Sequence, residues 1–169
     1  MGVIHLMDSV TRPSAPAIDA TSHPGRRAML RLVLDRELAS YEVTIAAPIQ
    51  VVWEHLTTAE GLVRWVGPEA SADPAPGGIL RWTHQNGASV VGRFVELVPY
   101  RRLVFAYGWE DGRMGVPPES TTVEVDLVEE DGATTLRLVH HGLPPRTVQD
   151  HQQGWAHVLG ALRAALSPE

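Results

Sequence analysis

The chain has 169 residues, no cysteine, and a formal net charge of −6 from 14 basic and 20 acidic residues. This length suits one domain with a sizeable core, and the acidic balance argues against an extended nucleic-acid interface, which needs clustered Lys and Arg. The lack of cysteine excludes disulfides, thiolate catalysis and cysteine-ligated zinc, and no apolar run approaches the roughly 18 residues that span a bilayer.

The first 28 residues contain Pro13, Pro16 and Pro24 among small and polar residues, without an apolar period. This composition predicts a flexible leader, followed by a single domain over residues 29–169. Residues 29–38 alternate like a strand and also suit a helix, and we expect an extended lead into the first strand. No continuous apolar stretch of signal-peptide length precedes the domain, so we expect a cytoplasmic protein.

A strand followed by two short helices is predicted next. Residues 41–45 alternate between apolar and polar, which indicates a strand. Residues 49–56 place apolar side chains at i, i+3, i+4 and i+7, which is typical of a helix with one buried face. Thr57 and Glu60 form a capping-box pattern for the second helix, and Gly67-Pro68 stops it.

The rest of the chain predicts antiparallel strands and then one long helix. The expected strands cover residues 79–84, 90–98, 103–109, 122–127 and 134–141. Asn86-Gly87 is a strong hairpin signal, and residues 111–119 form a longer loop that suits a lid. Thr147 with Asp150 is expected to cap the final helix, whose apolar stripe needs the sheet as its partner. That stripe consists of Val148, His151, Trp155, Val158, Leu159, Leu162 and Leu166.

An ordered set of short pieces identifies a family resemblance. The pieces are Ala47-Pro48, Val52-Trp53, Leu56-Thr57, Glu60, Trp65, Gly77-Gly78, Gly92, Glu96, Pro99, Arg102-Leu103, His140 and Gly154-Trp155. From about residue 41 to residue 166 they resemble the homologues of the heat-shock-protein ATPase activator, a branch of the SRPBCC group. The resemblance implies the START-like helix-grip fold that is shared with the birch pollen allergen. This is an α+β fold in which a curved antiparallel sheet wraps around a long C-terminal helix, with two short helices after the first strand.

The resemblance also implies a cavity between the sheet and the C-terminal helix. We therefore expect the chain to bind a hydrophobic or aromatic small molecule, because aromatic-lined cavities with few polar groups are the usual form of such sites. The predicted ligand-binding residues are Trp65, Trp82, Phe94, Tyr107, Trp109, His140, Trp155 and Leu159. No catalytic residue, metal site or cofactor is predicted; His140 and His151 could meet in space, but the sequence alone does not show it.

His140 has three interpretations. Period 2 places it on the same face as Leu136 and Leu138, and the family pattern also has histidine here. It could contact a ligand, act as a general acid or base, or be satisfied inside the sheet by its neighbours. Catalysis would need a second converging group, for which Glu96 or Tyr107 is the candidate. Alternation leaves the face of Glu96 open, because a one-residue bulge would reverse it.

Two other functions stay open. One is a cyclase- or hydratase-like enzyme acting on a polyketide-like substrate. The other is a chaperone cofactor or other interaction module, which rests on fold-level resemblance. Residues 29–34 form an apolar segment that could pair with another chain, so the protein is expected to be a monomer or a homodimer.

Overall fold

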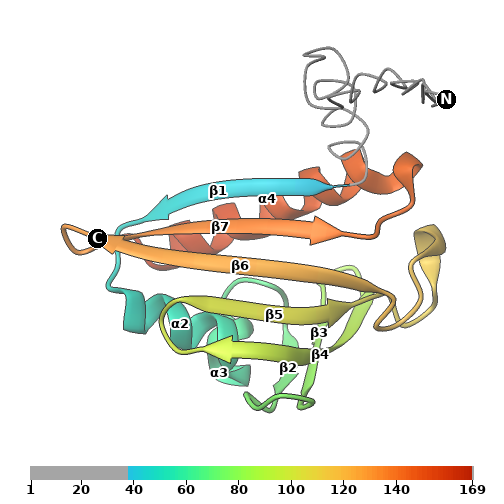
Figure 1. Ribbon diagram of the computed structural model, residues 1–169, viewed down its shortest axis with the longest axis horizontal. Helices are drawn as coiled ribbons and strands as arrows, with labels where there is room; N and C mark the ends of the chain where they lie inside the picture. Colours follow the sequence, from blue (N-terminus) through green and yellow to red (C-terminus); the bar gives the residue numbers. More distant parts are fainter. Residues whose placement is uncertain (1–37, 169) are drawn as a thin grey trace, which may run out of the picture.

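The structure is a computed structural model that describes residues 38–168 (Figure 1). Seven antiparallel strands form one sheet in the order β1-β7-β6-β5-β4-β3-β2. The strands are β1 (Ala39–Ile45), β2 (Glu69–Ala72), β3 (Ile79–Thr83), β4 (Ser89–Val98), β5 (Arg102–Tyr107), β6 (Thr121–Glu130) and β7 (Ala133–His141). The helices are α2 (Ile49–Thr57), α3 (Ala59–Leu62) and α4 (Val148–Ala165), with short 3-10 turns η1 (Arg113–Gly115) and η2 (Pro145–Thr147). The leader predicted for residues 1–28 lies outside the described part, as does all but Leu38 of the segment 29–38.

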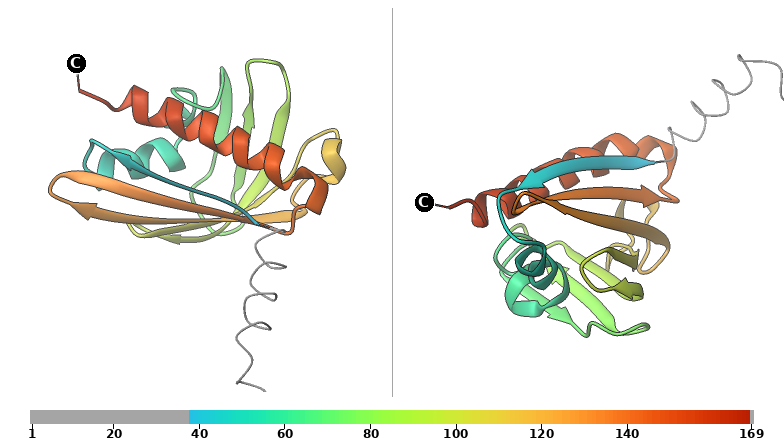
Figure 2. Two further views of the ribbon diagram at one scale, coloured as in Figure 1. Left: turned by 90° about the horizontal axis from the view of Figure 1, so that it is seen from above. Right: turned by 60° about the vertical axis from the view of Figure 1, so that its left-hand side comes forward.

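The helix α4 lies along the concave side of the curved sheet, and the β3–β4 hairpin rises beside it (Figure 2). The buried side chains of α4, among them Leu159 and Leu162, pack against the inward-facing residues of the strands. On β6, for example, Val123, Val125 and Leu127 are buried while the residues between them are not. The predicted α+β helix-grip fold is therefore confirmed. No helix among the described residues is long and apolar enough to cross a membrane.

Both predicted helix caps are wrong in detail. The α3 cap is Thr58, whose hydroxyl accepts from the Gly61 N–H at 3.0 Å, while the Thr57 hydroxyl donates to the Trp53 carbonyl of the preceding helix. At α4, Thr147 is the N-cap residue as predicted, but its hydroxyl donates to the Pro144 carbonyl at 2.9 Å and makes no cap hydrogen bond. In both cases a neighbouring carbonyl binds the hydroxyl that the sequence pattern assigned to the cap.

One strand was missed by the prediction, and another ends earlier than predicted. The short strand β2 was not predicted, because its small and polar residues show no apolar period and it forms only by pairing with β3 at the sheet edge. The strand β5 ends at Tyr107, two residues before the predicted end. Trp109 keeps one isolated bridge to Val90, so it remains beside the sheet without belonging to it.

A bulge in β4 settles the face of Glu96. Phe94 pairs with Phe105 and Glu96 pairs with Val104, so Val95 is an extra residue between them. The extra residue reverses the alternation. Phe94 consequently points into the core, whereas Glu96 lies on the outer face of the sheet and is exposed.

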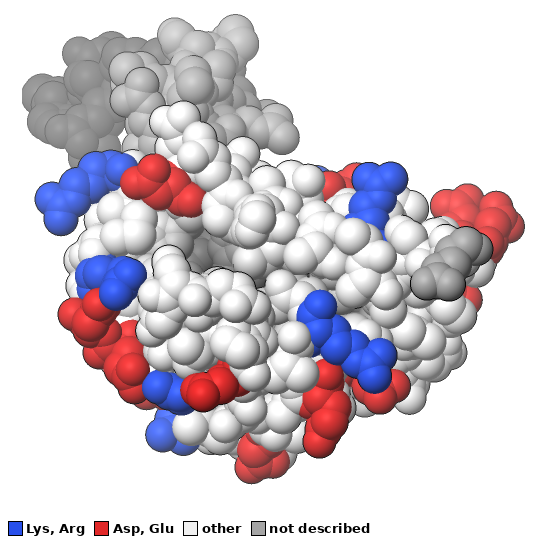
Figure 3. Space-filling model, turned by 180° about the vertical axis from the view of Figure 1, so that it is seen from behind, with Lys and Arg blue, Asp and Glu red and all other residues white. Residues whose placement is uncertain are grey.

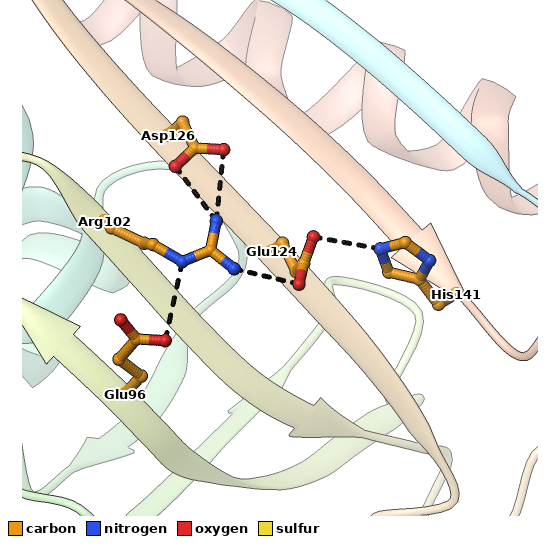
Figure 4. A network of polar contacts seen from close by, with 5 residues as sticks. All are labelled: Glu96, Arg102, Glu124, Asp126 and His141. Carbon is orange, nitrogen blue, oxygen red and sulfur yellow. Dashed lines mark hydrogen bonds and ion pairs between the residues drawn. The ribbon is translucent and has the colours of Figure 1, made fainter.

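On that outer face, Arg102 holds three strands together (Figure 4). Its guanidinium contacts Glu96 at 3.5 Å, Glu124 at 2.9 Å and Asp126 at 3.1 Å, and His141 contacts Glu124 at 3.1 Å. Such partly exposed pairs contribute about 1 kcal/mol or less each. The network gives Arg102 a structural role and leaves the concave face as the place for a ligand site.

Candidate ligand-binding cavity

A cavity of about 500 Å³ lies between α4, the β3–β4 hairpin and the segment that follows α3. Seen from behind, the surface is hollowed, and most side chains around the hollow are uncharged (Figure 3). The lining consists of Val63, Arg64, Trp65, Val66, Gly67, Trp82, His84, Gln85, Asn86, Tyr107, Trp109, Met114, Asp150, His151, Gly154, Trp155, His157, Val158 and Ala161. A volume of this size is within the usual range for small-molecule sites.

Four aromatic rings from four parts of the fold form its inner wall. Trp82 comes from β3, Tyr107 from the end of β5, Trp109 from the loop after it and Trp155 from α4. Tyr107 is central, with ring centroids 6.0 Å from Trp82, 5.9 Å from Trp109 and 5.7 Å from Trp155. The rings are tilted or edge-on to each other, which is the favoured geometry for aromatic packing. These ring–ring contacts within the protein therefore hold the wall in place.

Three of the indole N–H groups donate to imidazole nitrogens. The pairs are Trp82 with His84 (3.1 Å), Trp109 with His151 (3.2 Å) and Trp155 with His140 (3.1 Å). Because an indole nitrogen can only donate, each accepting imidazole nitrogen must be unprotonated. Burial lowers the pKa of all three histidines, that of His140 to about 3. These three histidines are therefore neutral at pH 7.

His140 belongs to a buried chain of hydrogen bonds behind the wall. Its Nδ1 accepts from Trp155, so its Nε2–H donates to the Thr121 hydroxyl at 2.8 Å, which in turn donates to the Tyr107 carbonyl at 2.8 Å. The side chain has no exposed surface, and the Tyr107 ring lies 4.5 Å from its own ring. Both ring nitrogens are thus used within the protein, which is the third of the interpretations considered above.

The cavity brings together five of the eight predicted residues, namely Trp65, Trp82, Tyr107, Trp109 and Trp155. The other three do not line it. Phe94 is packed in the core, His140 lies behind Tyr107, and Leu159 borders a separate void of about 20 Å³ deeper between sheet and helix. Ligand contact therefore stays a prediction for the five lining residues alone.

Sequence reasoning did not assign several lining residues, although two simple signals point to them. His84 lies two positions after Trp82, so strand alternation puts both on one face. On α4, His151, Gly154, Trp155 and Val158 follow the i, i+3, i+4, i+7 spacing of one helix face. The charged residues at the mouth, Arg64 and Asp150, are exposed, and no sequence pattern assigned either of them to a ligand site.

The loop between β5 and β6 closes one side of the cavity. Val116 anchors this loop. Its side chain is fully buried, and its backbone carbonyl accepts a hydrogen bond from the backbone N–H of Trp109 at 2.8 Å. Met114 lines the cavity from a left-handed backbone conformation with φ of 60°, which costs a non-glycine residue on the order of 1 kcal/mol. Arg113 lies over the Trp109 ring at 5.6 Å and pairs with Asp111. This loop remains the predicted lid.

Histidines and carboxylates form no group that could hold a metal ion within residues 38–168. His140 and His151 do meet, with ring centroids 5.4 Å apart. Each of their ring nitrogens, however, is engaged with an indole, a hydroxyl or the Thr147 carbonyl. The contact between these two rings is therefore one of packing.

Comparison with known proteins gives a family and a set of similar structures. Residues 46–167 match the family described as Activator of Hsp90 ATPase homolog 1-like protein. No curated protein sequence matches the chain.

Three solved structures illustrate the structural likeness. DynU16, from the dynemicin biosynthetic locus, is 26% identical to this chain with a TM-score of 0.66. The match covers 77% of this chain but only 47% of DynU16. CalU16 from Micromonospora echinospora is 28% identical with a TM-score of 0.62, covering 78% of this chain and 76% of CalU16. The Aha1 dimer from Colwellia psychrerythraea is 22% identical with a TM-score of 0.63, covering 76% of this chain and 95% of that chain. At this identity the likeness supports a shared fold and nothing further.

Proposed function

The chain belongs to the family of Activator of Hsp90 ATPase homolog 1-like proteins, and we propose that it binds a hydrophobic or aromatic small molecule between its sheet and α4. The observation that carries this proposal is the cavity of about 500 Å³ with its aromatic inner wall. Cavities with this size and lining are the common form of small-molecule sites. The similar protein DynU16 comes from a biosynthetic locus, which is consistent with the binding of a small molecule.

Binding is favoured over catalysis by the placement of the titratable groups. An active site needs at least two such groups converging on one substrate. Glu96 lies on the outer face of the sheet, so it cannot act together with His140 across the cavity. The nitrogens of His140 are occupied by Trp155 and Thr121, so neither of the two pairs nominated from the sequence, His140 with Glu96 or with Tyr107, offers a free acid and base to a substrate.

A role as an interaction module has less support. Residues 29–34, which suggested pairing with another chain, lie outside the described part. The Colwellia protein forms a dimer, but it is only 22% identical to this chain. Its oligomeric state is therefore not transferred to this chain. Pulling down partners with and without residues 1–38 would separate this function from ligand binding.

The proposal is tested by thermal unfolding in the presence of a panel of aromatic and lipid-like compounds. A ligand that binds only the native state raises the unfolding temperature. When the free ligand concentration is a hundred times the dissociation constant, the native state gains about 2.7 kcal/mol of stability. We expect uncharged aromatic compounds to raise it and saturated fatty acids to leave it unchanged. A panel in which no compound raises the unfolding temperature would move the interaction module to first place.

A further inference from the structure

We propose that the ligand is an uncharged, planar aromatic molecule with one carbonyl oxygen, and that the Tyr107 hydroxyl donates a hydrogen bond to that oxygen. The inference rests on the proposed function, because it specifies the ligand of the same cavity. It follows from an inventory of the donors and charges in the wall.

The indole donors of the wall are already committed. Trp82, Trp109 and Trp155 donate to histidines, as described above, and Trp65 Nε1 donates to the His55 carbonyl at 2.9 Å. A ligand could recruit any of them only by breaking an internal hydrogen bond, which leaves a buried acceptor unpaired at a cost of about 1–3 kcal/mol. Recognition by the indoles is therefore recognition by their ring faces and edges.

The Tyr107 hydroxyl is different. The Tyr107 side chain is only 4% exposed and lines the cavity. Its hydroxyl has no hydrogen-bond partner within residues 38–168, and it is not sealed into the protein as the unpaired His55 Nε2 is. Because the hydroxyl reaches the cavity and uses no hydrogen-bond partner among the described residues, it is positioned to donate to a molecule inside the cavity.

The hydroxyl acts as a neutral donor. Burial raises the pKa of Tyr107 above its ordinary value, which keeps the proton in place at physiological pH. A carbonyl oxygen is its natural partner, because it accepts and does not need to donate in return.

The charge distribution selects against ionised ligands. The charged lining residues Arg64 and Asp150 are exposed, as are Gln85, Asn86 and His157, while the buried part of the lining is formed by Val66, Gly67, Trp82, Tyr107, His151, Trp155 and Val158. Moving a carboxylate or an ammonium group into such a wall removes its hydration without supplying a partner. A neutral ring system avoids that cost and gains the aromatic contacts.

The test uses three probes of one shape. Fluorenone carries a carbonyl, fluorene lacks it, and fluorenone-4-carboxylate adds a negative charge. Binding of each is measured by equilibrium dialysis at pH 8 with the full chain, the Tyr107→Phe variant and the Gly154→Phe variant, whose added ring occupies the mouth of the cavity. We expect wild-type protein to bind fluorenone about five- to tenfold more tightly than fluorene and the carboxylate at least about tenfold more weakly than fluorenone.

The Tyr107→Phe variant should bind fluorenone and fluorene equally, with fluorene affinity as in wild type. Its unfolding temperature should not fall, because the lost oxygen has no hydrogen-bond partner among residues 38–168. If Tyr107→Phe keeps the preference for the ketone, or unfolds well below the wild type, the hydroxyl has another role and the inference is wrong.

The outcomes also separate this inference from the function beneath it. Equal binding of fluorenone and fluorene by wild type, blocked by Gly154→Phe, would overturn the role of Tyr107 and leave the aromatic site standing. Binding of neither probe to the wild type would contradict both.

Discussion

Replacing His140 by alanine is expected to lower the free energy of unfolding by about 3 kcal/mol. The change leaves the buried Trp155 N–H without an acceptor and removes one partner of the Thr121 hydroxyl, and an unpaired buried donor costs about 1–3 kcal/mol. The space left by the ring adds a cavity term. Urea unfolding at pH 8 measures the loss.

The matched control is His141→Ala, at the next position of the same strand. His141 is on the outer face and contacts Glu124 in a partly exposed pair, so its removal should cost about 1 kcal/mol or less. Equal losses for the two variants would show that the buried hydrogen-bond chain contributes nothing special.

The same histidine predicts acid sensitivity. Because burial lowers the pKa of His140 from 6.5 to about 3 in the native state, the unfolded chain takes up a proton between these values and the native protein does not. Stability is therefore complete above pH 6.5 and falls as the pH drops through that window, by up to about 1.4 kcal/mol per pH unit for one group. His84 and His151, whose pKa values are also lowered by burial, add to the slope.

The His140→Asn variant checks the assignment, because its amide oxygen can accept from Trp155 but does not titrate. Urea unfolding between pH 4 and pH 7 should give a shallower loss than in wild type, by about one proton. A variant with an unchanged slope would place the acid sensitivity on other groups.

The second large effect is expected at Gly154, where phenylalanine should abolish ligand binding without harming the fold. Gly154 is on the face of α4 that lines the cavity, and a Cβ built there meets no atom within 4 Å. The ring would therefore occupy the mouth instead of clashing with the sheet. Replacing a helical glycine also favours the helix slightly, by up to about 1 kcal/mol. Equilibrium dialysis with fluorenone measures the binding.

Gly160 provides the matched control for this experiment. It is on the same helix, is exposed, and has equally open space around an added Cβ, but it does not line the cavity. Gly160→Phe should bind like the wild type, and both variants should unfold at or above the wild-type temperature. Unimpaired binding by Gly154→Phe would place the ligand elsewhere on the protein.

The fold could be predicted largely because its long elements repeat clearly. The alternation of Val123, Val125 and Leu127 and the apolar stripe of α4 both have one structural solution. The strand β2 has no such pattern, since its four residues become a strand only when β3 offers an edge. The Glu96 face was undecidable for a related reason, because the bulge at Val95 depends on pairing with β5.

The candidate site was predictable in kind more than in detail. Periodicity correctly placed His140 on the inner face, but it gives no depth, and His140 lies behind Tyr107 while His151 lines the cavity. Two of the three indole–histidine pairs, Trp109 with His151 and Trp155 with His140, join residues from different elements. No local pattern encodes these two contacts, which formed only in the assembled fold, whereas Trp82 and His84 are only two positions apart in the sequence.

Native mass spectrometry of protein purified gently from its own host tests ligand binding most directly. Intact and denatured masses would be compared for the wild type, Gly154→Phe and Gly160→Phe. The account predicts a non-covalent mass excess on the wild type and on Gly160→Phe that is absent from Gly154→Phe, with a mass that belongs to an uncharged aromatic compound. An excess that persists in Gly154→Phe, or none on any of the three, would contradict it.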